Sequence, residues 1–185
     1  MKAGAGKSKG NAKERELCRK FSMWISADER DDLVWRSASS GAVATIRSRS
    51  KMAKTKGDYR SQVGDLCSID PLSSHFFDQV AIESKHYADL QLDNLVCNLP
   101  SKAAKFWTTH VELCQKALKA PWVVMKQNRK PDLLFVSRSF LVTIPDGCEV
   151  ILRDIAIANF PQLGCSVYDL DDFLKSVSYF DLFGN

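Results

Sequence analysis

The sequence predicts a single α/β domain, and three observations support this prediction. The chain has 185 residues, of which 45% are hydrophobic, and this is enough for one sizeable core. Apolar runs of strand length alternate with longer segments whose apolar residues recur at helical spacing. The six cysteines are scattered without a Cys-x-x-Cys pair, which argues against a structural zinc site and for reduced thiols in the cytoplasm.

The N-terminal part of the chain divides into a tail and a helix. Residues 1–11 are small and basic, and we expect them to form a flexible tail before a single domain over residues 12–185. Residues 12–26 are predicted to form the first helix of that domain. Its apolar side chains share one helical face: Leu17, Cys18, Phe21, Trp24 and Ile25.

Glu14 is the unusual residue of this helix. It precedes Leu17 by three positions and Phe21 by seven, so its carboxylate points into the apolar face. Glu16 falls on the opposite side, with Lys13 and the solvent. A carboxylate on a buried face indicates function, so Glu14 is the candidate site residue. The alternative is that Glu14 only marks the exposed start of the helix, where a negative charge suits the helix dipole.

A short strand predicted at residues 33–36 leads into a long basic loop. The segment from Arg36 to Arg60 holds seven basic residues and one acid, Asp58, among Ser, Thr, Gly and Ala. Long loops of this kind are commonly functional or disordered, and this composition suits contacts with phosphate. The candidate DNA-binding side chains of this segment are Arg36, Arg47, Arg49, Lys51, Lys54, Lys56 and Arg60.

The charge distribution supports the same interpretation. Residues 1–60 have a net charge of +8, and residues 61–185 have a net charge of −4. This asymmetry predicts a polyanion-binding surface in the first third of the chain, although a solvated basic tail would give the same pattern. No run approaches the roughly 20 apolar residues of a membrane span, and the basic N-terminus lacks the apolar core of a secretory signal.

Two predicted strands carry the most informative charges. Asp65 opens a strand over residues 65–69, and a strand over residues 76–85 carries Glu83 and Lys85. Side chains two positions apart on a strand share a face, so Glu83 and Lys85 project together. If the two strands are neighbours, Asp65 reaches the same point. Two carboxylates and an ammonium group there predict a Mg²⁺ site. The lysine would orient or deprotonate a water molecule there, or stabilise the developing charge.

The alternative is that this Glu-x-Lys pattern is an ordinary exposed strand face. Against this, the strand that carries it is apolar, and charged groups in a buried strand are costly unless they are paired or bind an ion. The apolar residues before the pair are Phe76, Phe77, Val80, Ala81 and Ile82.

The rest of the chain completes the α/β pattern. Ser101 is a predicted N-cap, and Asp169 or Asp171 is predicted to cap the last helix. His110 lies in the apolar face of its helix, where a core histidine is the simpler interpretation than a ligand. The expected elements are a turn at 70–74, a helix at 101–119, strands at 122–125 and 133–137, strand-like runs within 140–152, a strand at 166–168 and a helix ending at Val177.

Four short motifs in this order resemble the PD-(D/E)xK nuclease superfamily. Within that superfamily the chain is similar to the archaeal-type Holliday junction resolvases and to related phage-encoded nucleases. The likeness covers about residues 10–140. The motifs are KEREL at 13–17, WRSASSG at 35–41, GDL at 64–66 and AIESK at 81–85.

The resemblance implies a restriction-endonuclease-like core, with a mixed central sheet flanked by helices. It also implies that Asp65, Glu83 and Glu14 bind Mg²⁺ or Mn²⁺ and that Lys85 lies beside the attacking water. Ser39 or Ser40 would match the loop serine near the scissile phosphate, with Arg36 as a phosphate contact. The family's Pro-Asp is replaced by Gly64-Asp65, and the insertion between Gly41 and Gly64 leaves the substrate open.

The expected activity is therefore hydrolysis of branched or double-stranded DNA by a metal-dependent endonuclease. Cutting a four-way junction symmetrically would require a homodimer, and a phage-encoded chain would act in the host cytoplasm. Two alternatives remain. One is a nicking or restriction-type nuclease of the same fold, and the other is a DNA-binding module without catalysis.

Overall fold

The structure is a computed structural model that describes residues 5–37 and 63–184. The predicted DNA contacts Ser39, Ser40, Arg47, Arg49, Lys51, Lys54, Lys56 and Arg60 lie outside the described residues. The elements in chain order are α1 (Ala5–Ile25), β1 (Val34–Arg36), β2 (Leu66–Ser68), α4 (Pro71–Gln79), β3 (Val80–Tyr87), α5 (Leu92–Val96), α6 (Lys102–Ala117), β4 (Ala120–Gln127), β5 (Asp132–Ser137), α7 (Arg138–Leu141), α8 (Asp146–Ile155), β6 (Ala158–Phe160), η1 (Pro161–Leu163), β7 (Cys165–Asp169), α9 (Leu170–Ser176) and α10 (Tyr179–Phe183).

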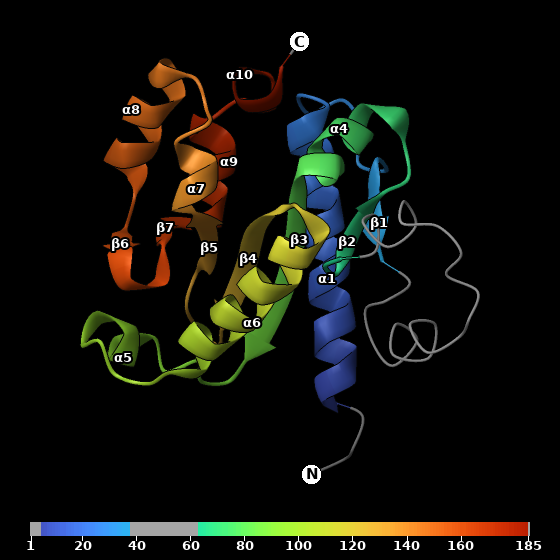
Figure 1. The fold of residues 1–185 in the computed structure, drawn as a ribbon. Coiled ribbons are helices and arrows are strands. Elements are labelled where there is room, and N and C mark those ends of the chain that lie inside the picture. Colours follow the sequence, from blue (N-terminus) through green and yellow to red (C-terminus); the bar gives the residue numbers. More distant parts are fainter. Residues whose placement is uncertain (1–4, 38–62, 185) are drawn as a thin grey trace.

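A five-stranded mixed sheet forms the centre of the molecule (Figure 1). Its strand order is β3-β4-β5-β7-β6, with β3 and β4 parallel and the other neighbouring pairs antiparallel. A separate antiparallel pair, β1 and β2, lies beside β3. The predicted α/β class, with a mixed sheet flanked by helices, is confirmed.

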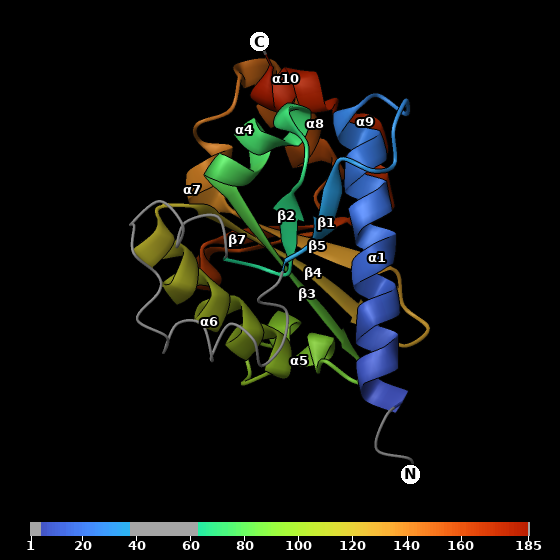
Figure 2. The same cartoon turned by 90° about the vertical axis from the view of Figure 1, so that its right-hand side faces the viewer.

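Helices cover both faces of the sheet (Figures 1 and 2). Trp122 and Val124 of β4 pack into the core cluster that includes residues of α1, α4, α9 and α10. Val123 and Met125, the alternate residues of the same strand, pack with α5 and α6 in the second cluster. A strand buried on both faces needs apolar residues at every position, which explains the continuous run in β4.

Helix α1 differs from its prediction at one end and at one side chain. It begins at Ala5 rather than at residue 12, and it ends at Ile25. Leu17 and Phe21 are fully buried, as their spacing predicts. The solvent position predicted for Lys13 is wrong, because its side chain is only 6% exposed and forms an ion pair with Asp132. The carboxylate of Asp132, at the start of β5, draws this lysine into the interior.

The prediction of a strand from residue 76 was wrong for its first four residues. Residues 71–79 form α4, and the strand β3 begins only at Val80. Asp70 caps this helix by accepting a hydrogen bond from the backbone N–H of Leu72 at 3.0 Å, and Pro71 occupies the first turn. Asp-Pro is a helix-start signal, so the segment interpreted as a turn is the beginning of the helix.

The prediction of strand-like runs within residues 140–152 was wrong. These residues belong to α7, to the turn at 142–144 that follows it, and to α8. Cys148 and Leu152 are buried four residues apart, whereas the intervening Val150 and Ile151 are 49% and 40% exposed. The apolar run therefore follows one face of a helix and does not form a buried strand.

The other predicted elements occur close to their expected positions. Ser101 accepts a hydrogen bond from the backbone N–H of Ala104, and Asp169 caps α9. The short elements α5, β6 and α10 were not predicted, because segments of three to five residues carry too little periodicity. Within the described part of the chain, no helix is both long enough and apolar enough to span a membrane.

Candidate active site

The site is built where β2 approaches the edge of β3. The backbone N–H of Asp65 donates to the carbonyl of Ile82 at 2.7 Å, and the N–H of Ser84 donates to the Asp65 carboxylate at 2.8 Å. Gly64 makes this approach possible. It has a φ of +95°, and a Cβ at this position would lie 2.5 Å from the Ile82 carbonyl oxygen. The glycine before Asp65 is therefore required by the contact between the strands.

Glu83 and Lys85 extend from the same face of β3, as their spacing predicts. The Lys85 ammonium donates to Glu83 Oε1 and lies 5.7 Å from the ring centre of Phe106 on α6. The two side chains are 20% and 25% exposed, so both remain within reach of a ligand. Burial alone would lower the pKa of Lys85, but the charge of Glu83 and its hydrogen bond raise this pKa above its ordinary value.

Glu14 approaches from α1 and forms an ion pair with Arg36 of β1. The side chain of Glu14 is 13% exposed, whereas that of Glu16 is 48% exposed. Arg36 also donates to the side-chain oxygen of Asn11 at 2.9 Å. Helix α1 therefore turns Glu14 inward, as its helical spacing predicts. The guanidinium group of Arg36 on β1 balances the charge of Glu14.

Asp65 has the most perturbed carboxyl group of the site. Burial raises its pKa to about 7, and the nearby charge of Glu83 adds to the effect, with a smaller contribution from Glu14. The Ser84 hydrogen bond and the charge of Lys85 act in the opposite direction. Negative charge is therefore crowded at this point, and a cation would relieve the crowding.

We use the name acidic site for Glu14, Asp65, Glu83 and Lys85. The structure brings Asp65, immediately before β2, together with Glu83 and Lys85 of β3. Glu14 is close enough for its charge to act on Asp65, but its own contact is with Arg36. Among residues 5–37 and 63–184, no three Asp, Glu, His or Cys side chains lie together closely enough to enclose a metal ion.

The donor set nevertheless suits a hard divalent cation. Mg²⁺ is commonly held by one or two carboxylates, with water and substrate phosphate completing its shell. Asp65 and Glu83 supply two such carboxylates at the edge of the sheet, and the raised pKa of Asp65 reflects its burial first and the charge of Glu83 second. Both features fit a Mg²⁺ or Mn²⁺ ligand pair.

Sequence reasoning assigned His110 only to the core, and the structure places it against the acidic site. Its side chain is 2% exposed on α6, and its Nδ1 lies 3.9 Å from Glu83 Oε2. Its Nε2 lies 2.9 Å from the carbonyl oxygen of Ala81. Burial lowers the pKa of His110, which favours the neutral imidazole. The available signal was a polar residue within an apolar helical face.

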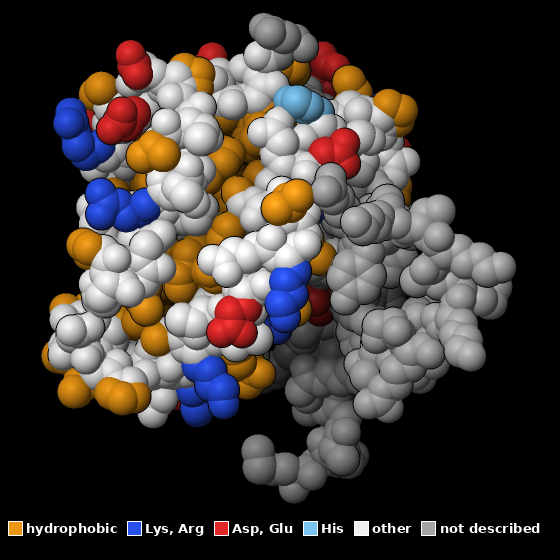
Figure 3. All heavy atoms as spheres, viewed as in Figure 1, with side chains coloured by type: hydrophobic (Ala, Val, Ile, Leu, Met, Phe, Trp, Pro, Cys, Tyr) orange, Lys and Arg blue, Asp and Glu red, His pale blue; other side chains and the backbone are white. Residues whose placement is uncertain are grey.

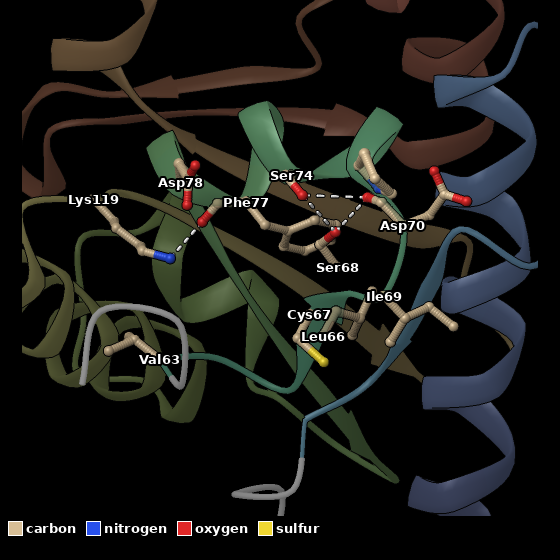
Figure 4. A pocket seen from close by; sticks show the side chains of 11 residues that line it. Val63, Leu66, Cys67, Ser68, Ile69, Asp70, Ser74, Phe77, Asp78 and Lys119 are labelled. Carbon is tan, nitrogen blue, oxygen red and sulfur yellow. Dashed lines mark hydrogen bonds between the residues drawn. The ribbon is translucent and has the colours of Figure 1, made fainter. Parts of the chain in front are cut away.

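A cavity of about 390 Å³ lies on the other side of β2, against α4 (Figure 4). Leu66 and Phe77 contribute to its apolar wall, and the polar Asp78 and Lys119 lie at one end. The Lys119 ammonium donates to the carbonyl of Phe77. No residue of the acidic site lines this cavity, so the crowded carboxylates and the cavity mark different places.

Basic side chains do not form one patch on the face of the molecule seen in Figure 3. The Lys and Arg residues of the described part stand apart there, between apolar and uncharged groups. Of the residues predicted to bind DNA, only Arg36 belongs to the described segments.

The mixed sheet and the acidic edge formed by β2 and β3 together define an architecture of the PD-(D/E)xK nuclease type. A family model described as "Phage putative PDDEXK endonuclease" matches residues 5–181, and the chain belongs to this family. Searches among curated proteins and among solved structures gave no match. Family membership supports a nuclease that acts on DNA.

Proposed function

We propose that this protein is a Mg²⁺- or Mn²⁺-dependent endodeoxyribonuclease whose active centre is the acidic site. The observation that carries the proposal is the junction of β2 and β3. Two backbone-anchored contacts hold Asp65 beside the segment that bears Glu83, at distances of 2.7 and 2.8 Å. The membership in a nuclease family supports the same assignment.

In this proposal Asp65 and Glu83 would hold the cation. Glu14 would become a third ligand by releasing Arg36, with which it is now paired. The bound cation would stabilise negative charge on the phosphate and on the leaving oxygen. The Ser84 N–H keeps one Asp65 oxygen oriented, so the carboxylate presents its other oxygen to the ligand.

Lys85 is proposed to orient the attacking water. Its ammonium group is held between Glu83 and the ring of Phe106, so it needs little rearrangement to donate a hydrogen bond to that water. The water oxygen forms a bond to phosphorus while the opposite P–O ester bond breaks in line. The water gives up a proton to bulk solvent, and the departing oxygen takes one up from solvent.

Branched DNA is the proposed substrate, with a four-way junction as its simplest form. The similarity of the four motifs to Holliday junction resolvases supports this choice, and so does the basic composition of residues 36–60. Paired cuts across a junction would require a homodimer, which is part of the same proposal. Arg36, which already bridges to the acidic site through Glu14, is the proposed contact to the scissile phosphate.

The test compares cleavage of a labelled four-way junction with cleavage of a linear duplex of the same sequence. Wild type, Glu83→Gln and Glu112→Gln are assayed with Mg²⁺, with Mn²⁺ and with EDTA. Glu112 is an exposed acid on α6 and serves as the matched control. We expect metal-dependent paired cuts in the junction that Glu83→Gln abolishes and Glu112→Gln leaves intact.

Other outcomes narrow or remove the proposal. Equal cutting of junction and duplex would retain the nuclease and remove the junction specificity. Binding of both DNAs without any cleavage that depends on Glu83 would replace catalysis with a DNA-binding module. Cleavage that persists in EDTA would remove the cation from the proposal.

A further inference from the structure

We propose that His110 is a positioning residue that fixes the orientation of the Glu83 carboxylate. This inference rests on the proposed function, because it gives Glu83 a partner that prepares it to bind a cation. His110 belongs to α6, which crosses the face of β3 from which Glu83 extends. Helix α6 therefore contacts the acidic site through His110, in addition to covering the sheet.

The hydrogen-bond partners decide where the proton of His110 lies. The carbonyl oxygen of Ala81 can only accept, and it lies 2.9 Å from Nε2. Nε2 therefore carries the hydrogen and donates it to the backbone of β3. In the neutral ring this leaves Nδ1 with a lone pair and no hydrogen.

That lone pair faces the acidic site. His110 Nδ1 is buried and has no hydrogen-bond partner among the described residues, and Glu83 Oε2 lies 3.9 Å from it. Both atoms are acceptors, so their approach becomes favourable when a hydrogen-bond donor bridges them. A single water molecule that donates to both atoms satisfies this requirement.

This arrangement restrains both oxygens of Glu83. Lys85 holds Oε1 by donating to it. The proposed water bridge from His110 would hold Oε2, which lies 3.9 Å from Nδ1. The same imidazole is hydrogen-bonded to the backbone of Ala81, two residues earlier on β3. The ring is therefore fixed relative to the strand that carries Glu83. Outer partners of metal-binding groups typically change metal affinity about 10- to 100-fold when they are removed.

Two substitutions separate the two contacts of His110. In His110→Asn, the amide oxygen takes a place close to that of Nδ1, and the contact with Ala81 is lost. In His110→Gln, the amide N–H takes a place close to that of Nε2, and the acceptor near Glu83 is lost. Cys114→Ala, which removes a buried neighbour of the same ring at 3.3 Å, is the control for packing.

The measurement is Mn²⁺ binding by calorimetry to the full chain without DNA, with thermal unfolding of each variant recorded in EDTA. We expect His110→Gln to bind Mn²⁺ about 10- to 100-fold more weakly, and His110→Asn and Cys114→Ala to remain within about threefold of wild type. Unfolding should show the opposite order, with His110→Gln nearer to wild type than His110→Asn.

The failure of this inference differs from the failure of the proposed function. Wild-type affinity in His110→Gln, or equal losses in both histidine variants, would overturn the positioning role while leaving the cation site in place. A wild-type protein that binds no Mn²⁺, with or without DNA, would remove the cation site and this inference together.

Discussion

Asp65 is partly buried immediately before β2, and Asp132 is buried at the start of β5, but their carboxyl groups have opposite pKa shifts. Burial and the charge of Glu83 raise the pKa of Asp65 to about 7. At Asp132 burial acts in the same direction, but the hydrogen bond and charge of Lys13, followed by those of Lys126, lower the pKa below its ordinary value. The difference comes from the neighbouring charges and not from burial.

The two surroundings serve different purposes. Asp132 is in contact with three lysines, which we call the Asp132 cluster: Lys13, Lys20 at 3.7 Å and Lys126 at 3.3 Å. Asp65 shares its surroundings with two further carboxylates. A buried acid surrounded by lysines is a stable structural contact, whereas crowded acids indicate a place that binds a cation. Helix α1 links both, because consecutive residues, Lys13 and Glu14, take part in one each.

The largest expected effect is on activity, and it concerns Asp65. Asp65→Asn should reduce cleavage about 10³-fold or more, because it removes a proposed cation ligand and with it several kcal/mol of stabilisation of the transition state. The melting temperature should stay unchanged or rise, since the repulsion with Glu83 is relieved. Nuclease assays and calorimetry of the same samples check both parts, with the exposed Asp154→Asn as control. Cleavage close to that of wild type would contradict the assignment.

The largest expected effect on stability concerns the other region. Asp132→Ala should lower the free energy of unfolding by about 3 kcal/mol, because the buried Lys13 loses one partner and keeps only the half-exposed Glu16, 2.8 Å away. Urea unfolding measures this loss. Asp171→Ala is the matched control, since its ion pair with Lys20 is half exposed and should contribute about 1 kcal/mol or less. A loss equal to that of the control would show that the Asp132 cluster is not a structural contact.

The pH dependence of stability should differ between the two aspartates. Asp65 has a folded pKa of about 7 against 3.8 for its ordinary value, so its contribution is full below about pH 4 and is lost as the pH rises through about 7. Asp132 has a lowered folded pKa, so its contribution is present above about pH 4 and is lost as the pH falls through that lower value.

Unfolding free energies between pH 3 and pH 8 in EDTA measure these two contributions. Wild type should lose a few kcal/mol of unfolding free energy between about pH 4 and pH 7, and Asp65→Asn should remove this loss. Asp132→Asn should instead reduce the loss of unfolding free energy that occurs as the pH falls below about 4. Equal pH profiles for the two variants would contradict the opposite pKa shifts of Asp65 and Asp132.

The smallest effect is expected at the ion pair that Glu14 of the acidic site forms with Arg36. Arg36→Ala should cost about 1 kcal/mol of stability, because its pair with Glu14 is partly buried, whereas Arg19→Ala should cost less than about 0.5 kcal/mol. Without DNA, the freed Glu14 should strengthen Mn²⁺ binding about two- to fivefold, which is worth about 0.4–1 kcal/mol. Calorimetry on both variants measures their stability and their Mn²⁺ affinity. Weaker Mn²⁺ binding in Arg36→Ala would contradict the proposal that Glu14 releases Arg36 to bind the cation.

The sequence was sufficient for the parts of the site that depend on local periodicity. The helical spacing of Glu14 and the strand spacing of Glu83 and Lys85 both agree with the sides on which these side chains lie. The α/β class followed from the alternation of apolar runs. The catalytic and metal-binding roles of these residues stay predictions.

The remaining features depend on contacts between distant segments. Nothing local to His110 indicates that α6 will cross over Ala81 and Glu83, and nothing local to Lys13 indicates a buried partner 119 residues away. The error at residues 76–79 was of another kind. The helix signal of Asp70 was present, but the apolar run after it was interpreted as strand.

The close approach at Gly64 implies that the position of Asp65 beside Glu83 depends on the absence of a Cβ at residue 64. Beyond the contacts of Asp65, no ladder of backbone pairs joins β2 to β3 in the described chain. The small size of Gly64 therefore determines how closely the segment before β2 approaches β3. An alanine there would move the acids apart without altering a single charge. A protein changed in this way would retain its electrostatic attraction for DNA, and would be suited to trap the uncut substrate.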